Sequence, residues 1–235
     1  LTPIVARPEL AVLPPKTRRL LRSLSAHPRY LVAVISGRAL SDIRRLVNLD
    51  TIIYAGNHGL EWAGPAVRYL NPSAEAARPA LGKISGQLRE KLGKLEGLEI
   101  EDKKLSLSIH YRRVDGKNLD NLFRILENVT RQAVNQGLIA ITEGKKVVEI
   151  RPPVDWDKGT IVNWLREELS GPDSGGNIFT LYIGDDRTDE DAFAAIGDDG
   201  VTARVGDPDS DSRAQYFLND TAEVAAVLEK LNNLP

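Results

Sequence analysis

The sequence predicts an α/β protein built on a parallel sheet that helices cover on both faces. Three observations predict this class: short apolar segments rich in β-branched residues, helical stretches between them, and turn signals that end each apolar segment. Strands buried on both faces of a sheet are continuous apolar runs, and their alternation with helices is typical of parallel sheets. The 235 residues are 42% hydrophobic and 27% charged, so the chain can bury a sizeable core.

Two strands with a helix between them are expected early in the chain. Residues 31–35 form an apolar run that ends at Ser36-Gly37, and residues 51–54 form another that ends at Gly56-Asn57-His58-Gly59. Residues 41–47 have the polar pattern of a surface helix. We expect both strands to be fully buried.

The last third of the chain repeats this arrangement. Residues 178–183 are an apolar strand that stops at Gly184-Asp185-Asp186, and residues 201–205 are another that stops at Gly206. Before them, Lys158 opens a predicted helix with Ile161, Leu165 and Leu169 on one side. We expect these strands to join the same sheet as the first two.

The middle of the chain has a different pattern. Residues 105–110 alternate between apolar and polar side chains, which is typical of a strand with one wetter face, and residues 147–151 alternate less cleanly. Residues 119–133 have apolar side chains at helical spacing. We therefore expect an inserted α/β module at residues 73–152, with a core domain formed by residues 1–72 and 153–235 and prolines at both junctions.

Composition excludes several classes of protein. The 31 Lys and Arg residues and 33 Asp and Glu residues leave a net charge of −2, which argues against a nucleic-acid binder. The absence of Cys excludes a disulfide framework, a thiolate zinc site and a cysteine nucleophile. Neither a membrane-spanning apolar run nor a signal-peptide pattern is present, so we expect a cytoplasmic protein that does not interact with membranes.

Five of the eight residues from Gly184 to Asp191 are acidic, and they follow directly on an apolar strand. Carboxylates crowded at a strand end favour a cation, and hard oxygen ligands suit Mg²⁺. The alternative is an acidic helix N-terminus with capping-box spacing between Thr188 and Asp191. That alternative does not explain Asp185 and Asp186, which precede the cap, so the metal interpretation is favoured.

Two further residues matter in combination with these carboxylates. Ser36 follows a strand, where its hydroxyl and the next backbone amides can face an anion. Lys158 begins a helix, where its ammonium can meet a phosphate as a point charge. Alone, the first is an ordinary turn residue and the second an ordinary solvated lysine. Together with the carboxylates, they are what a Mg²⁺-dependent phosphoryl-transfer site requires.

Six motifs in a fixed order resemble those of trehalose-6-phosphate phosphatases in the haloacid dehalogenase superfamily. They cover nearly the whole chain and read Val34-Ile-Ser-Gly-Arg38, Gly56-Asn-His-Gly59, Ile109-His-Tyr-Arg112, Val148-Glu-Ile-Arg-Pro152, Asp157-Lys-Gly159 and Gly184-Asp-Asp-Arg-Thr-Asp-Glu190. The resemblance implies a Rossmann-like core with a small α/β cap, Mg²⁺ as cofactor, and hydrolysis of trehalose 6-phosphate to trehalose and phosphate. It also suggests a trehalose-phosphate synthase as a functional partner.

The resemblance also implies roles for individual residues. Ser36 would hydrogen-bond the phosphoryl group, and Lys158 would neutralise its charge. The metal would be held, directly or through water, by Asp185, Asp186 and Asp189. Substrate-binding residues would line the mouth of the core site (Arg38, Asn57, His58 and Gly59) and reach the sugar from the cap (Glu101, Lys103, His110, Arg112, Glu149 and Arg151). We expect His110 and Arg112 to share one strand face, and Glu149 and Arg151 another.

The sequence departs from the family pattern at one point. The family's nucleophile belongs to an Asp-x-Asp-Gly-Thr motif, whereas the first Asp here is Asp42. We expect the natural polypeptide to continue upstream of Leu1 with a buried strand that ends in this motif. Two alternatives remain open: a phosphatase for another sugar phosphate, such as sucrose phosphate, and a non-catalytic sugar-phosphate-binding partner of a synthase.

Overall fold

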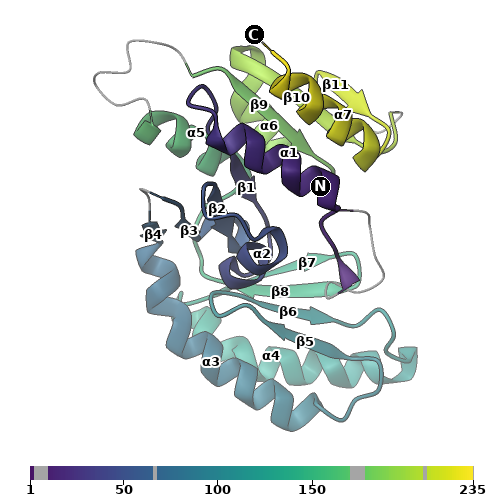
Figure 1. Cartoon of the computed structure of the whole chain (residues 1–235). Helices are drawn as coiled ribbons and strands as arrows, with labels where there is room; N and C mark the ends of the chain where they lie inside the picture. The colour runs from purple at the N-terminus through teal and green to yellow at the C-terminus, as the bar shows by residue number, and fades with distance from the viewer. Residues whose placement is uncertain (3–9, 66–67, 170–177, 209–210, 235) are drawn as a thin grey trace. The chain divides into compact units, whose positions relative to one another are not determined.

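The computed structural model describes residues 1–2, 10–65, 68–169, 178–208 and 211–234 (Figure 1). The chain divides into two compact units, one formed by Leu1–Arg68 with Trp156–Pro235 and the other by Tyr69–Asp155. The α/β fold class predicted from the sequence is confirmed. The module predicted at residues 73–152 lies inside the second unit, and its role as a cap stays a prediction.

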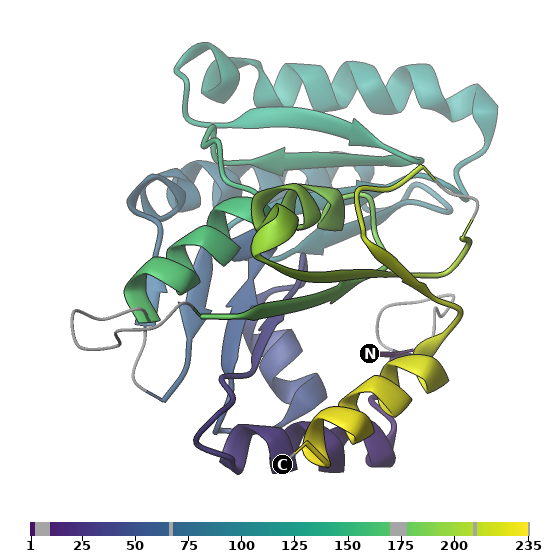
Figure 2. The ribbon, with the colours of Figure 1, turned by 90° about the horizontal axis from the view of Figure 1, so that it is seen from above.

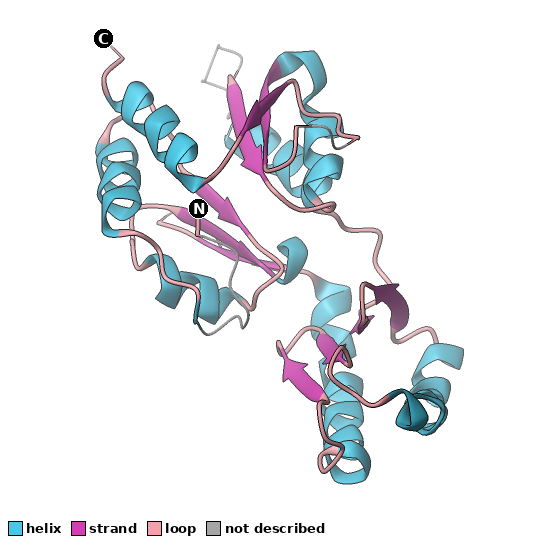
Figure 3. Cartoon of the chain, turned by 90° about the vertical axis from the view of Figure 1, so that its right-hand side faces the viewer, coloured by secondary structure: helices cyan, strands magenta, loops and turns pink. Residues whose placement is uncertain are grey.

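The first unit contains two sheets, whose strands are drawn in magenta in Figure 3. One sheet has the order β1-β2-β3-β4, with β1 parallel to β2 and β2 antiparallel to β3. The other has the order β11-β10-β9 and is parallel throughout. Their bounds are β1 (Ala33–Ile35), β2 (Ile53–Gly56), β3 (Glu61–Ala63), β4 (Arg68–Leu70), β9 (Thr180–Gly184), β10 (Gly200–Val205) and β11 (Tyr216–Leu218). The last two residues of β4 belong to the second unit.

Helices cover these sheets, and α1 packs against α7 (Figure 2). The α7 helix begins after Asp220, whose side chain accepts hydrogen bonds from the amides of Ala222 and Glu223. The helices of this unit are α1 (Pro15–Ala26), α2 (Leu40–Val47), α5 (Lys158–Leu169), α6 (Asp189–Ile196) and α7 (Thr221–Asn232), with short 3₁₀ turns η2 (Asn57–Gly59) and η4 (Gly197–Asp199). In the described ranges, no helix is both long and apolar enough to cross a membrane.

Strands β1 and β9 are neighbours in space that share no backbone ladder within the described residues. Ile35 of β1 and Tyr182 of β9 pack against the same buried cluster of Val162, Ala192 and Ile196. Each strand is nevertheless the edge of its sheet. The described residues therefore form two separate sheets, one mixed and one parallel, where the sequence predicts one parallel sheet.

The prediction that residues 31–35 form a fully buried strand is wrong, and the strand predicted at residues 178–183 is not fully buried either. Ala33 is exposed, and the side chains of residues 180–183 are only partly buried. The physical reason is that β1 and β9 are edge strands, so a neighbouring strand is present on one side only. The strand predicted at residues 51–54 is observed as β2, which begins two residues later and is buried throughout.

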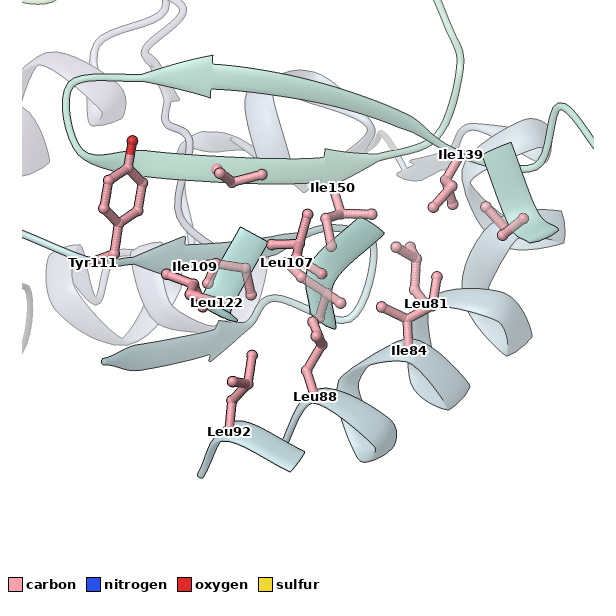
Figure 4. Packing of buried hydrophobic residues seen from close by; sticks show 14 residues of the cluster. Leu81, Ile84, Leu88, Leu92, Leu107, Ile109, Tyr111, Leu122, Ile139 and Ile150 are labelled. Atoms are coloured by element: carbon pink, nitrogen blue, oxygen red, sulfur yellow. The ribbon is translucent and has the colours of Figure 1, made fainter. Parts of the chain in front are cut away.

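The second unit packs two helices against one face of an antiparallel sheet with the order β5-β6-β8-β7. Figure 4 shows Leu81, Ile84 and Leu88 of α3 meeting apolar side chains such as Leu107 and Ile150 of the sheet. The bounds are α3 (Pro72–Leu92), β5 (Glu99–Asp102), β6 (Leu107–His110), a 3₁₀ turn η3 (Gly116–Asn118), α4 (Leu119–Asn135), β7 (Ala140–Gly144) and β8 (Val147–Arg151). The helix predicted at residues 119–133 is confirmed as part of α4, and β8 alternates in burial as expected. The wetter face predicted at residues 105–110 is wrong, because Ser106 and Ser108 are buried.

The first junction of this unit contains the predicted proline. Pro72 is the first residue of α3, where its missing N–H costs nothing, and the Asn71 side chain caps the helix by accepting from the amides of Ser73 and Ala74.

Strand β6 ends at His110, so the prediction that Arg112 shares a strand face with it is wrong. Arg112 lies in the exposed turn that follows, because the chain leaves the sheet there.

Candidate functional site

The carboxylate of Asp189 gathers the polar groups at the carboxyl end of β9. Its Oδ1 accepts hydrogen bonds from the Lys158 ammonium and from the Tyr182 hydroxyl, both at 2.7 Å. Its Oδ2 accepts from the backbone amides of Asp185 at 3.0 Å and Asp186 at 2.9 Å. Two donors on each oxygen satisfy this buried carboxylate. Asp189 therefore fixes both the lysine and the β9–α6 turn.

Two glycines permit this arrangement. A Cβ at Gly184 would lie 2.3 Å from Cγ of Asp189, so only glycine lets the carboxylate fold back beneath the turn. A Cβ at Gly159 would lie 2.5 Å from the carbonyl oxygen of Asp191, so glycine also lets the start of α5 approach α6. This close approach brings Lys158 to Asp189.

Tyr182 stays a hydrogen-bond donor at any physiological pH. Burial, followed by the negative charge of Asp189, raises the pKa of its phenol above the usual value. Its ring packs edge-on against Phe193, with 5.8 Å between ring centroids. The hydroxyl is therefore held in place on Asp189.

The three acidic residues predicted to bind a metal are in different situations. The Asp185 side chain is exposed and accepts no hydrogen bond in the described part of the chain, whereas Asp186 accepts from the Arg187 amide at 2.6 Å and the Thr188 hydroxyl at 3.4 Å. No three acidic or histidine side chains among the described residues form a metal-binding group. Mg²⁺ commonly takes one or two carboxylates, with water and substrate oxygens as its other ligands. Asp185 with Asp186 fits such a site, while Asp189 is already saturated.

The capping box considered as the alternative is not formed. Thr188 precedes α6, but its side chain makes no capping hydrogen bond to the helix and instead reaches Asp186. The acidic run is therefore organised by the turn around Asp189.

A second group of predicted residues lies where β1 and β2 end. The Arg38 amide donates to Ser36 Oγ at 3.2 Å, and the Arg38 carbonyl accepts from the Asn57 amide at 2.7 Å. The Ser36 carbonyl accepts from the His58 amide at 3.0 Å. A Cβ at Gly37 would lie 2.5 Å from the His58 ring, so the two strand ends are closely packed. Ser36, Arg38, Asn57 and His58 are thus brought together.

Asn57 of this group and the nearby Gly59 have structural roles. Asn57 is 1% exposed, and its side-chain amide donates to Glu61 at 2.7 Å. The same Glu61 oxygen accepts from the Leu40 amide at the start of α2. Gly59 has a φ of +93°, and a Cβ there would overlap Ile161 of α5. Ser36, Arg38 and His58 are partly exposed, whereas Asn57 is buried, so these three are better placed than Asn57 to meet a ligand.

In the second unit, a polar cluster lies on the face of the sheet opposite the helices. The Lys103 ammonium lies 3.9 Å from Glu101 Oε2 and 3.7 Å from Glu149 Oε1, and its side chain is only 10% exposed. His110 Nε2 lies 3.3 Å from the same Glu101 oxygen. Ser108 lies opposite both Glu101 and Glu149 in the strand register and donates to Glu149 at 3.3 Å. We call Glu101, Lys103, His110 and Glu149 the cap cluster.

The two predicted arginines of this unit stand apart from one another. Arg151 follows Glu149 by two residues on β8, so both side chains leave the same face of the strand, as predicted. Its Nε is buried without a hydrogen-bond partner in the described residues. Arg112 lies beyond the end of β6 and has no described contact with the cap cluster.

Sequence reasoning missed two residues of the core unit. Tyr182 had a local signal, because its side chain carries a hydroxyl in an otherwise apolar strand, three residues before Asp185. Glu190 had none: it accepts from the Arg204 guanidinium, the Ser212 hydroxyl and the Arg213 amide, which are distant in sequence. Burial alone would raise the pKa of Glu190, but these hydrogen bonds lower it below its usual value.

Comparison with known proteins gives a consistent result. The sequence model of the trehalose-phosphatase family matches residues 1–222. Trehalose-phosphate phosphatase B of Arabidopsis thaliana is 33% identical over 242 residues, covering 98% of this chain and 63% of that protein. The trehalose-phosphate phosphatase of Mycobacterium tuberculosis is 36% identical over 236 residues, covering 98% of this chain and 58% of that protein. The chain thus spans less than two thirds of these relatives.

Among solved structures, a trehalose-6-phosphate phosphatase related protein superposes with a TM-score of 0.82. The match covers 99% of this chain and 93% of that one, at 24% sequence identity. At this level of identity the similarity establishes the fold.

Proposed function

This chain belongs to the trehalose-phosphatase family, and from that premise we propose that it hydrolyses trehalose 6-phosphate to trehalose and phosphate with Mg²⁺ as cofactor. The single observation that carries the proposal is the group at the end of β9, where one buried carboxylate holds an ammonium and the turn that presents Asp185. An ammonium beside an exposed carboxylate at a strand end suits a phosphate ester bound through a cation.

In this proposal, Ser36 and Lys158 of the first unit bind the phosphoryl group. The Ser36 hydroxyl already accepts from the Arg38 amide, so its own proton is available to donate to a phosphoryl oxygen. Lys158 is held by Asp189 and offers its remaining N–H groups to the same phosphoryl group. These contacts strengthen as negative charge develops in the transition state, which is how they accelerate the reaction.

Asp185, supported by Asp186, would hold the Mg²⁺. When bound, the ion neutralises charge on the phosphoryl oxygens. Asp189 serves the metal indirectly, since it fixes the amides of both residues.

The nucleophile is proposed to lie on a strand between β1 and β9. Among the described residues, β1 and β9 each lie at the edge of a sheet, which supports this placement, since a strand paired to both would satisfy their backbone groups.

On that strand, the first Asp of the expected Asp-x-Asp-Gly-Thr motif would attack phosphorus in line. A bond forms between its carboxylate oxygen and phosphorus as the bond to the sugar oxygen breaks, which gives an aspartyl-phosphate. The second Asp would protonate the leaving sugar oxygen and then take a proton from the water that hydrolyses the intermediate.

The cap cluster is proposed to select the sugar. An ammonium that lies within 4 Å of each of two carboxylates offers several donors and acceptors, which suits an array of sugar hydroxyls. Such contacts are remote from phosphorus, so they contribute binding energy that distinguishes one phosphate ester from another. The proposal includes a cytoplasmic location and a trehalose-phosphate synthase as the source of substrate.

A phosphate-release assay tests the proposal. The full-length polypeptide is given trehalose 6-phosphate, sucrose 6-phosphate, glucose 6-phosphate and p-nitrophenyl phosphate at equal concentrations with Mg²⁺. We expect the highest kcat/KM with trehalose 6-phosphate. A preference for sucrose 6-phosphate would indicate a phosphatase for another sugar phosphate. Binding of a sugar phosphate without release of phosphate would indicate the non-catalytic, sugar-phosphate-binding alternative.

A further inference from the structure

Tyr182 shares one oxygen with the lysine of the candidate site. Its hydroxyl and the Lys158 ammonium each lie 2.7 Å from Asp189 Oδ1, and no sequence motif assigned the tyrosine a role. The ring is fixed by edge-on packing against Phe193. The Tyr182 hydroxyl is therefore held in a fixed position within the candidate site.

Sharing an acceptor has a consequence for the ammonium. A carboxylate oxygen that accepts a hydrogen bond from a phenol has less charge to offer a second donor. The ammonium is consequently held less tightly by Asp189 than it would be alone. Within the described residues it donates only to Asp189, which leaves its other N–H groups for an incoming anion.

We propose that Tyr182 is a positioning residue for phosphoryl transfer. Its hydrogen bond to Asp189 weakens the ion pair between Asp189 and Lys158 and fixes its orientation. The ammonium can then also donate to the phosphoryl group. The inference rests on the proposed function and adds to it a residue that acts through Asp189.

The geometry separates this role from a general structural one. The amides of Asp185 and Asp186 bind Oδ2, the carboxylate oxygen that Tyr182 does not touch. Removing the phenol oxygen should therefore alter the lysine side of Asp189 and leave the turn that presents Asp185 in place. The Mg²⁺ concentration for half-maximal activity should then stay constant.

The test compares Tyr182→Phe with Tyr30→Phe in the full-length enzyme. Tyr30 is a matched control, because its hydroxyl donates a partly buried 2.9 Å hydrogen bond to the Leu231 carbonyl elsewhere in the same unit. Four quantities are measured: kcat/KM for trehalose 6-phosphate and for p-nitrophenyl phosphate, the half-maximal Mg²⁺ concentration, the thermal unfolding midpoint, and the affinity for inorganic phosphate in excess chelator.

We expect Tyr182→Phe to lower kcat/KM about tenfold with both esters, as the loss of a hydrogen bond to a charged group predicts. Phosphate affinity should fall several-fold, while the Mg²⁺ requirement stays unchanged. Tyr30→Phe should lower the unfolding midpoint to a similar extent and leave activity unchanged. Unaltered kcat/KM and phosphate affinity in Tyr182→Phe would overturn the inference, and so would a loss confined to trehalose 6-phosphate or a matching loss in Tyr30→Phe.

Failure of the proposed function would be seen separately. A wild-type enzyme inactive on trehalose 6-phosphate would refute the substrate assignment. The phosphate affinity measured in chelator does not depend on that substrate, so it would still decide the role of Tyr182.

Discussion

Lys158 donates to Asp189 across 2.7 Å, and the two side chains are 8% and 5% exposed. A buried ion pair is destabilised when one partner is removed, because the other charge is left uncompensated. We predict that Lys158→Met lowers the free energy of unfolding by about 3–5 kcal/mol. Phosphate release should fall by at least about a hundredfold with every ester, since we propose that the ammonium contacts the reacting group. Urea denaturation and a release assay measure both.

The double variant Lys158→Met with Asp189→Asn serves as its control. With both charges gone, we expect much of the stability to return while activity stays lost. A double variant as unstable as the single one would mean that packing, rather than the unpaired charge, accounts for the loss.

The metal prediction concerns Asp185. The Asp185 carboxylate is exposed at the end of β9 and accepts no hydrogen bond among the described residues. We therefore expect it to be a direct ligand of Mg²⁺. Chelator should abolish phosphate release and added Mg²⁺ should restore it. Asp185→Asn should raise the half-maximal Mg²⁺ concentration about tenfold or more, as loss of a charged ligand predicts.

Asp198→Asn is the matched control, since Asp198 is an exposed acidic residue outside the turn. It should leave the Mg²⁺ titration unchanged. Full turnover in excess chelator would refute the metal assignment.

The cap cluster predicts a difference between substrates. Glu149 is paired with Lys103 and Ser108 on the polar face of its sheet, so Glu149→Ala should remove a contact to sugar hydroxyls. We expect kcat/KM for trehalose 6-phosphate to fall by about 10- to 100-fold, with little change for p-nitrophenyl phosphate. Glu143→Ala, an exposed change on neighbouring β7, should affect neither substrate. Equal losses on both substrates in Glu149→Ala would assign Glu149 a structural role.

Glu190 predicts a pH-dependent contribution to stability. The pKa of this carboxyl is lowered in the folded state, so its ionised form stabilises the fold above the usual value of 4.5. That contribution is lost as the pH falls through the lowered pKa. Glu190→Gln should therefore lower the free energy of unfolding by about 1–3 kcal/mol at pH 7, with the gap closing towards pH 3. Glu168→Gln, an exposed change on α5, should show no such gap, and a gap independent of pH would contradict the assignment.

Much of the fold was predictable because each element has its own pattern. Strand β2 and helix α4 lie close to their predicted positions, since burial on both faces and helical periodicity are local signals. The half-exposed state of β1 and β9 was not predictable, because it depends on which strand pairs with which. The end of β6 at His110 was likewise set by where the chain leaves the sheet.

The candidate site was predictable in its residue types and less so in its connections. Acidic residues after a strand indicated a cation site, but the sequence could not tell that Asp189 turns inward while Asp185 stays exposed. That distinction depends on Lys158, which is 31 residues away in the chain. The role of Asn57 in holding Glu61 depends in the same way on how two strand ends pack.

The most direct measurement compares three polypeptides for folding and for phosphate release from trehalose 6-phosphate. One begins at Leu1, one carries an upstream strand ending in Asp-x-Asp-Gly-Thr, and one carries that strand with the first Asp changed to Asn. We predict that the first folds incompletely and is inactive, the second folds and turns over substrate, and the third folds without turnover. A stable, folded polypeptide that begins at Leu1 and releases phosphate would contradict the account, as would turnover by the Asn form.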